Sequence, residues 1–102
     1  MKLSIAGKYR TLVAALDGDL DHHSAENLRE RIDRELNRTG AVNIAFDFSR
    51  VSFMDSSGIG LILARYRFCQ NTGTSLYVEG VNRQTQKILA LAGIKTINDV
   101  AI

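Results

Sequence analysis

The spacing of apolar residues along the chain changes between two periods. In residues 42–48, apolar side chains alternate with polar or small ones, which is the period of a strand with one buried face. In residues 24–38 they recur at steps of three and four, which gathers Ala25, Leu28, Ile32 and Leu36 on one face of a helix. The chain is therefore predicted to mix strands with amphipathic helices.

The same two patterns, with glycine as the main punctuation, predict eight elements. Strands are expected at residues 2–6, 9–16, 42–48, 75–79 and 95–98, and helices at 24–38, 57–71 and 82–92. Asp17-Gly18-Asp19 is expected to end the second strand, and residues 49–55 are expected to form a loop. The apolar face of the third helix should consist of Thr85, Ile88, Leu89 and Ala92.

The resulting order of elements is β-β-α-β-α-β-α-β. Strands that alternate with helices after residue 24 predict a largely parallel sheet with crossover helices. The opening pair of strands, joined by a short turn at Gly7-Lys8, adds an antiparallel edge, so the sheet should be mixed. Because 102 residues is the usual size of one domain, we expect a single α/β domain over residues 1–102.

Polar residues and glycines stand where the predicted helices begin and end. Either Asp21 or Ser24 can cap the first helix, and Gly93 is expected to be the C-cap of the third. The entrance to the second helix offers three candidates for its N-cap, which are Asp55, Ser56 and Ser57.

Charge and composition argue against several classes of function. The net charge is +2, and acidic and basic residues interleave along residues 24–38, so there is no one-signed stripe for nucleic acid. The longest apolar run, Ile59–Ala64, is far shorter than the about 20 residues of a membrane-spanning helix. The first apolar stretch ends at Lys8, too early for a signal peptide. We expect a cytoplasmic protein that binds neither nucleic acid nor membrane.

Few residues could support catalysis or hold a metal. His22 and His23 are the only histidines, and adjacent helical residues point in different directions, so at most one could face Ser56 as a general base. Met54-Asp-Ser-Ser-Gly58 also lacks the first glycine of a nucleophile elbow. The single cysteine, Cys69, falls in an apolar helical pattern and is predicted to be a small core residue. We therefore expect no catalytic residues, no enzyme activity and no metal site.

The stretch from residue 46 to residue 60 carries most of the functional information. It joins the end of a predicted strand to the start of a helix, where open α/β sheets usually place ligand and partner sites. Gly58 and Gly60 are too few for a phosphate-binding loop, and the alternative reason for glycine is close approach of another surface to the backbone. The acidic turn at residues 17–21 is most simply solvated, since it lacks the spacing of a calcium-binding loop.

Two segments of the chain resemble a known family. These are Gly18-Asp-Leu-Asp-His-His-Ser-Ala-Glu-Asn-Leu28 and Val51-Ser-Phe-Met-Asp-Ser-Ser-Gly-Ile-Gly-Leu-Ile-Leu-Ala-Arg-Tyr66. They are similar to the STAS-domain anti-sigma factor antagonists, and within that family to its sporulation members. The resemblance covers nearly the whole chain and implies a single STAS domain.

The resemblance also implies a cycle of partner switching. Members of this family bind a serine kinase that is also an anti-sigma factor, and this binding releases the sigma factor. The kinase supplies ATP and Mg²⁺, phosphorylates one serine of the antagonist and dissociates, and a PP2C-type phosphatase removes the phosphate. By this resemblance the antagonist is expected to need no cofactor of its own and to be a monomer when free.

The family's acceptor serine can be placed on this sequence. It matches Ser56, directly after Asp55, and Asp21 matches an acidic residue lining the same surface. The remaining partner-binding positions are expected in the same motif, at Asp55, Ser57, Gly58 and Ile59. Phosphate adds a charge of about −1.5 to −2. A helix N-terminus stabilises such a charge by about 0.3–1 kcal/mol, so the switch should block an interface and leave the domain folded.

Two alternatives remain open from the sequence. One is a STAS scaffold or sensor subunit of a stress-signalling complex, or the STAS domain of an anion transporter. The other is a small serine hydrolase using Ser56 or Ser57. The chain also departs from the family, whose members usually have a further C-terminal helix, because the residues after Asn98 are too few to form one.

Overall fold

The eight predicted elements are all present, in the predicted order. The computed structural model describes residues 2–8, 10–94 and 96–97. Its elements are β1 (Lys2–Lys8), β2 (Thr11–Leu20), α1 (His22–Thr39), β3 (Asn43–Met54), α2 (Ser56–Thr72), β4 (Ser75–Glu79), α3 (Arg83–Leu91) and β5 (Thr96–Ile97). Half of the predicted last strand, residues 95 and 98, lies outside the described residues.

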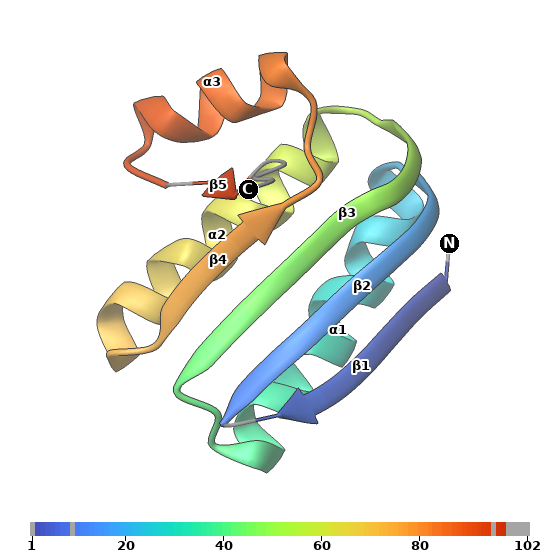
Figure 1. Ribbon diagram of the computed structural model, residues 1–102. Coiled ribbons are helices and arrows are strands. Elements are labelled where there is room, and N and C mark those ends of the chain that lie inside the picture. Colours follow the sequence, from blue (N-terminus) through green and yellow to red (C-terminus); the bar gives the residue numbers. More distant parts are fainter. Residues whose placement is uncertain (1, 9, 95, 98–102) are drawn as a thin grey trace.

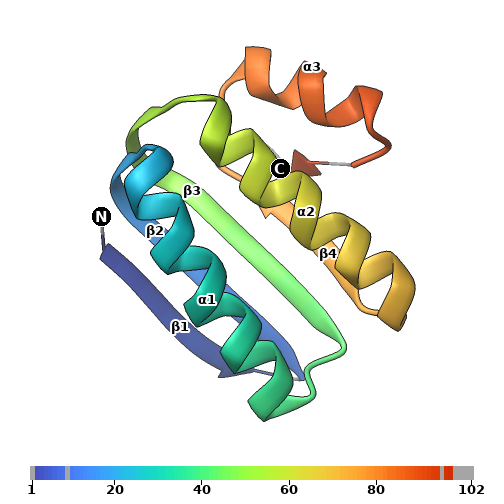
Figure 2. The ribbon, with the colours of Figure 1, turned by 180° about the vertical axis from the view of Figure 1, so that it is seen from behind.

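The strands form one mixed sheet in chain order, β1-β2-β3-β4-β5. β1 pairs with β2 antiparallel, and β2 to β5 pair parallel with their neighbours, as the sequence predicted. Since each parallel crossover is right-handed and moves in the same direction across the sheet, successive helices fall on the same face. Figures 1 and 2 show α1 and α2 side by side on that face, with α3 beside α2 near β5.

The hydrophobic core lies between the sheet and the two long helices. Alternate residues of β2 and β3 are buried, as expected for strands with one covered face. The predicted apolar face of α1 is confirmed, and Cys69 of α2 is buried as predicted. On α3 only Thr85 and Leu89 are buried; Ile88 is exposed and Ala92 lies beyond the helix, so the predicted face was too wide.

The strands that lead to the first two helices are longer than predicted, and the prediction of a loop at residues 49–55 is wrong. β2 continues through Asp17-Gly18-Asp19 to Leu20, and β3 continues to Met54. The two extensions pair with each other, and register shifts at two places accommodate the irregular sequence. Gly18 takes a positive φ of 115° there, which glycine tolerates. This pairing is a contact between distant segments, so local sequence patterns did not show it.

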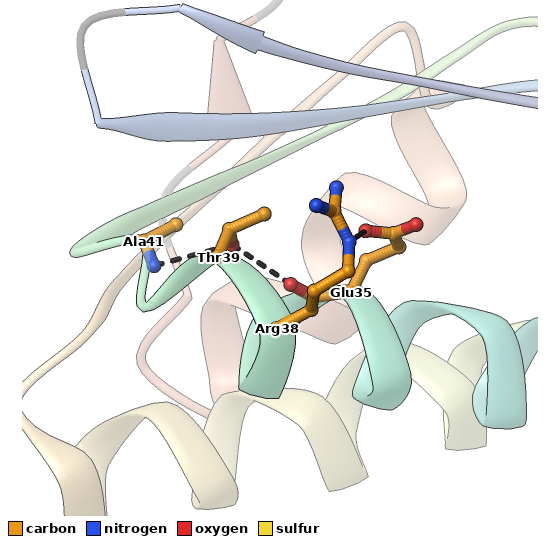
Figure 3. A network of polar contacts seen from close by, with 4 residues as sticks. All are labelled: Glu35, Arg38, Thr39 and Ala41. Carbon is orange, nitrogen blue, oxygen red and sulfur yellow. Dashed lines mark hydrogen bonds and ion pairs between the residues drawn. The ribbon is translucent and has the colours of Figure 1, made fainter.

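The far end of α1 is closed by its own side chains. Thr39 Oγ1 donates to the Glu35 carbonyl at 2.7 Å and accepts from the Ala41 N–H at 3.3 Å, beside a 2.7 Å ion pair between Arg38 Nε and Glu35 Oε2 (Figure 3). Gly40 follows with a positive φ of 62° and donates its N–H to the Leu36 carbonyl. These contacts end the helix at the end of the sheet opposite to the candidate site described below.

The third helix ends one residue earlier than predicted. Its C-cap is Ala92, and Gly93 follows with a positive φ of 87°. Among the described residues no helix is both long and apolar enough to cross a membrane.

Candidate functional site at two adjacent helix N-termini

Two helices begin side by side where β2 and β3 end. The last residues of these strands, Leu20 and Met54, are register partners, and the Asp55 N–H donates to the Leu20 carbonyl at 3.2 Å. The residue that directly follows each strand is the N-cap of a helix: Asp21 caps α1, and Asp55 caps α2. The fold thus places two carboxylates from distant parts of the chain at one end of the sheet, the upper end in Figure 1.

Asp21 caps α1, which decides between the two candidates that the sequence left open. Its carboxylate accepts from the Ser24 N–H at 2.9 Å, and the Asp21 N–H donates to Ser24 Oγ at 3.0 Å, which completes a capping box. The Ser24 backbone N–H, with help from the Ser24 hydroxyl, holds the pKa of the Asp21 carboxyl below its ordinary value. Asp21 is exposed and ionised at neutral pH, so a partner can reach its charge.

Asp55 caps α2 and leaves the adjacent serine free. Its Oδ1 accepts from the Ser57 N–H at 2.8 Å, and its carbonyl accepts from the Gly58 N–H at 3.0 Å. Ser56 is the first residue of the helix and is exposed, and its hydroxyl makes no hydrogen bond with any residue that the structure describes. Ser57 is half-buried. The hydroxyl of Ser56 is therefore the more accessible of the two.

Gly58 does not belong to the exposed surface, contrary to the expectation from sequence. It is buried, and a Cβ at this position would lie 2.3 Å from Met54 Cγ and 2.8 Å from Leu20 Cδ2. The absence of a side chain lets α2 start close to the ends of β2 and β3, at Leu20 and Met54. The neighbouring Ile59 is half-buried. Gly58 thus shapes the site from inside and offers a partner almost no surface.

Residues 2–101 match the family described as the STAS domain. The chain belongs to the STAS-domain family. This STAS domain is 34% identical over 83 residues to the anti-sigma F factor antagonist of Paenibacillus polymyxa. The aligned residues cover 81% of this chain and 71% of that protein. It is 30% identical over 84 residues to the anti-sigma-B factor antagonist of Bacillus subtilis (strain 168). That alignment covers 82% of this chain and 75% of that protein.

Solved structures give the same picture of the STAS domain. The anti-sigma factor antagonist SpoIIAA in its unphosphorylated form has a TM-score of 0.81 and 30% identity, over 93% of this chain and 86% of that one. The phosphorylated form of SpoIIAA from Bacillus has a TM-score of 0.82 and 27% identity, over 98% of this chain and 93% of that one. The family and fold expected from the sequence are thereby confirmed.

The STAS domain also presents an aromatic side chain that sequence reasoning missed. Phe53 lies on the extension of β3, opposite Asp19, and 55% of its surface is exposed. It lines a hollow of about 170 Å³ together with Phe48 and Asn82. The alternation of Val51 and Phe53 with polar residues was a signal for a strand here, but the prediction of a loop left it unused.

Neither histidine of the STAS domain is paired with a nucleophile. His22 and His23 are exposed in the first turn of α1, and no hydrogen bond joins either of them to Ser56 or Ser57. Within residues 2–8, 10–94 and 96–97, no three His, Cys, Asp or Glu side chains gather as metal ligands would. The geometry offers an exposed hydroxyl beside two carboxylates, which suits modification and recognition by another protein.

Proposed function

We propose that this STAS domain is an anti-sigma factor antagonist switched by phosphorylation of Ser56. In its unphosphorylated form it binds an anti-sigma factor that is also a serine kinase, and the sigma factor is released. The observation that carries the proposal is the free, exposed Ser56 hydroxyl at the first position of α2, directly after the N-cap Asp55 and at the end of the sheet where Asp21 caps α1. The similarity to anti-sigma factor antagonists and to SpoIIAA, solved with and without phosphate, supports it.

In the phosphorylation reaction the antagonist supplies only the serine hydroxyl that accepts the phosphate. The kinase brings ATP and Mg²⁺, and Ser56 Oγ attacks the γ-phosphorus while the bond to the leaving ADP oxygen breaks. The proton of the hydroxyl passes to a base of the kinase. The antagonist contributes an accessible nucleophile on a rigid helix end and needs no cofactor of its own.

Phosphorylation changes the charge of this surface more than its fold. The free N–H groups at the start of α2 favour an anion, so phosphoserine 56 is compatible with the folded helix. The same phosphate adds about two negative charges next to Asp21 and Asp55. A partner surface fitted to the smaller, less charged face would have to bury an unpaired dianion, which is costly. The switch therefore acts by releasing the partner, and a PP2C-type phosphatase resets it.

Site mapping tests the position of the switch. The protein is incubated with its kinase, ATP and Mg²⁺, and the modified residue is located by mass spectrometry. We expect phosphate on Ser56 in the wild type and in Ser57→Ala, and none in Ser56→Ala. Phosphate on Ser57 with Ser56 unmodified would contradict the assignment.

Binding measurements test the direction of the switch. Ser56→Ala should retain the kinase, because it keeps a small neutral surface and cannot be phosphorylated. Phosphorylated wild type should bind about a thousandfold more weakly, equivalent to about 4 kcal/mol, and Ser56→Asp should show part of this loss. Circular dichroism serves as the control for folding. Equal affinity of Ser56→Asp and wild type would rule out a charge-based switch.

A further inference from the structure

The hollow beside Phe53 lies between the extension of β3 and the start of α3. Its lining includes the turn before α3 and Thr85, in the first turn of that helix. Gly80 lets this turn lie against β3, because its φ is positive, at 79°, and a Cβ there would clash with the backbone nitrogen of Ser49. Figures 1 and 2 both show α3 beginning beside the start of α2. The hollow therefore lies at the same end of the molecule as Ser56.

Thr85 presents an unpartnered hydroxyl to this hollow. It lines the hollow, and only 6% of the residue is exposed. Its backbone N–H donates to Asn82 Oδ1 at 2.8 Å, whereas its hydroxyl makes no hydrogen bond with any residue that the structure describes. The hydroxyl oxygen is not sealed from solvent, so a group from outside can reach it. A polar side chain buried in this way without a partner is unfavourable, and it indicates a hydrogen-bonding group that the isolated chain lacks.

The start of α3 is also basic and has no counter-charge. Arg83 is the first residue of the helix, and the first turn contains no acidic residue. The N–H groups of Arg83 and Gln84 make no hydrogen bond within the described chain. A cation at this position is unfavourable, because it adds to the partial positive charge of the free N–H groups. Arg83 forms no ion pair with a described residue, and no acidic residue is among the described residues that line the hollow.

We propose that the hollow receives one acidic side chain of the anti-sigma factor. Its carboxylate accepts a hydrogen bond from the Thr85 hydroxyl and lies beside Arg83 at the positive end of α3. This inference rests on the proposed function, since it adds a second contact to the same interface. It gives the buried hydroxyl a partner and the basic helix start a counter-charge.

The size and position of the hollow favour a side chain of a protein over a free small molecule. Its volume of about 170 Å³ is below the roughly 300–1,000 Å³ of small-molecule pockets. Phe53 and Met54, which also line it, directly precede the Asp55-Ser56 pair. The helix starts near Ser56 carry carboxylates and the start of α3 carries Arg83, so a partner with the opposite charges would be held in one orientation.

Two substitutions at Thr85 separate binding from folding. Thr85→Val removes the hydroxyl at nearly constant volume, and we expect the affinity for the anti-sigma factor to fall about tenfold. Its melting temperature should equal or exceed that of wild type, since the hydroxyl has no partner in the chain and valine suits a helix about as well as threonine. Thr85→Ser keeps the hydroxyl and should bind much more tightly than Thr85→Val. If Thr85→Val fails to fold, the hydroxyl serves the fold and the inference is wrong.

A charge reversal tests the chemistry of the occupant. Arg83→Glu should weaken binding at least tenfold, with a loss that shrinks as salt is added, while the melting temperature of the free domain rises slightly. Lys87→Glu is the matched control, because it makes the same charge change one turn later on α3, outside the hollow lining, and should have a much smaller effect. Wild-type affinity in both Thr85→Val and Arg83→Glu would overturn the inference and leave the proposed function standing. If unmodified wild type does not bind the anti-sigma factor at all, both proposals fail.

Titration of the free domain with inorganic phosphate and with acetate tests the remaining occupant, a free anion. The amide chemical shifts of α3 report on binding, and we expect neither ion to saturate the hollow at millimolar concentration. Saturation by either ion at micromolar concentration, with the affinity for the anti-sigma factor unaffected, would make this a small-anion site and contradict the proposed occupant.

Discussion

At the scale of single residues, neighbouring positions of one motif turn out to have different roles. Asp55, Ser56 and Gly58 stand within four residues, yet the first caps the helix, the second is free at the surface and the third is buried. The helical period explains this division, because residues one or two apart point in different directions. Each position therefore needs its own prediction.

Gly58→Val should destabilise the domain. The added side chain would meet Met54 and Leu20, and overpacking of this kind costs about 1–3 kcal/mol. Urea denaturation of the variant and of wild type measures the difference. Equal unfolding midpoints would show that Met54 moves aside freely, and would reopen the hypothesis that Gly58 serves a partner.

Asp21→Asn separates the capping role from the charge. At neutral pH the melting temperature should change little, since asparagine caps about as well as aspartate. The pKa of Asp21 is lowered in the folded state, so the stability that ionisation adds is present above its ordinary value of 3.8 and is lost as the pH falls through the lower folded value. Wild type should therefore lose more stability than Asp21→Asn on acidification, and melting curves from pH 7 to pH 2 measure this.

The same variant tests the interface. If the Asp21 carboxylate pairs with a basic group of the anti-sigma factor, Asp21→Asn should bind more weakly and with less dependence on salt. A large fall in melting temperature at neutral pH with normal affinity would show that Asp21 serves the cap alone.

At the scale of elements, the extended ends of β2 and β3 build the site. They carry the chain to Leu20 and Met54 in register, so that two helices start from adjacent points. The extension of β3 also displays Phe53, which no element of the described chain covers fully. Exposed aromatic side chains beside a polar site are typical anchors of protein interfaces.

Phe53→Ala should weaken binding of the anti-sigma factor by at least tenfold, because removal of an aromatic anchor commonly costs about 2 kcal/mol or more of binding energy. Folding should be nearly unaffected, since the side chain is 55% exposed. Tyr77→Ala is a suitable control, because Tyr77 is 45% exposed but lies on β4, away from the two helix N-termini. Titration of both variants against the partner compares them directly, and similar losses would argue against a specific role for Phe53.

At the scale of the whole molecule, an ion pair joins the two long helices, α1 and α2. Arg65 of α2 is buried against Asp33 of α1, which is 38% exposed at its side chain. The same desolvated surroundings raise the pKa of the buried Cys69 thiol; Arg65 opposes this shift and Asp33 adds to it. Cys69 should accordingly be a poor nucleophile in the folded protein.

Removing one partner of this pair should cost more than replacing the buried arginine by an apolar residue. Asp33→Ala leaves Arg65 buried without its counterion, and we expect a loss of about 1–3 kcal/mol, less than for a fully buried pair because solvent reaches Asp33. Arg65→Met should be close to neutral. Urea denaturation of the two variants gives both values, and a larger loss for Arg65→Met than for Asp33→Ala would contradict this account.

The sequence by itself determined the order of elements, the mixed sheet, the buried face of α1, and the motif in which the exposed serine lies. These follow from periodicity, glycine positions and capping residues, all of which act between near neighbours in the chain. Only the tertiary structure decided that β2 and β3 extend to Leu20 and Met54, that Gly58 is buried while Gly60 is exposed, and that Arg65 meets Asp33. The physical reason is that each of these depends on contacts between segments distant in sequence, and local patterns do not specify which distant residue fills the space beside a given side chain.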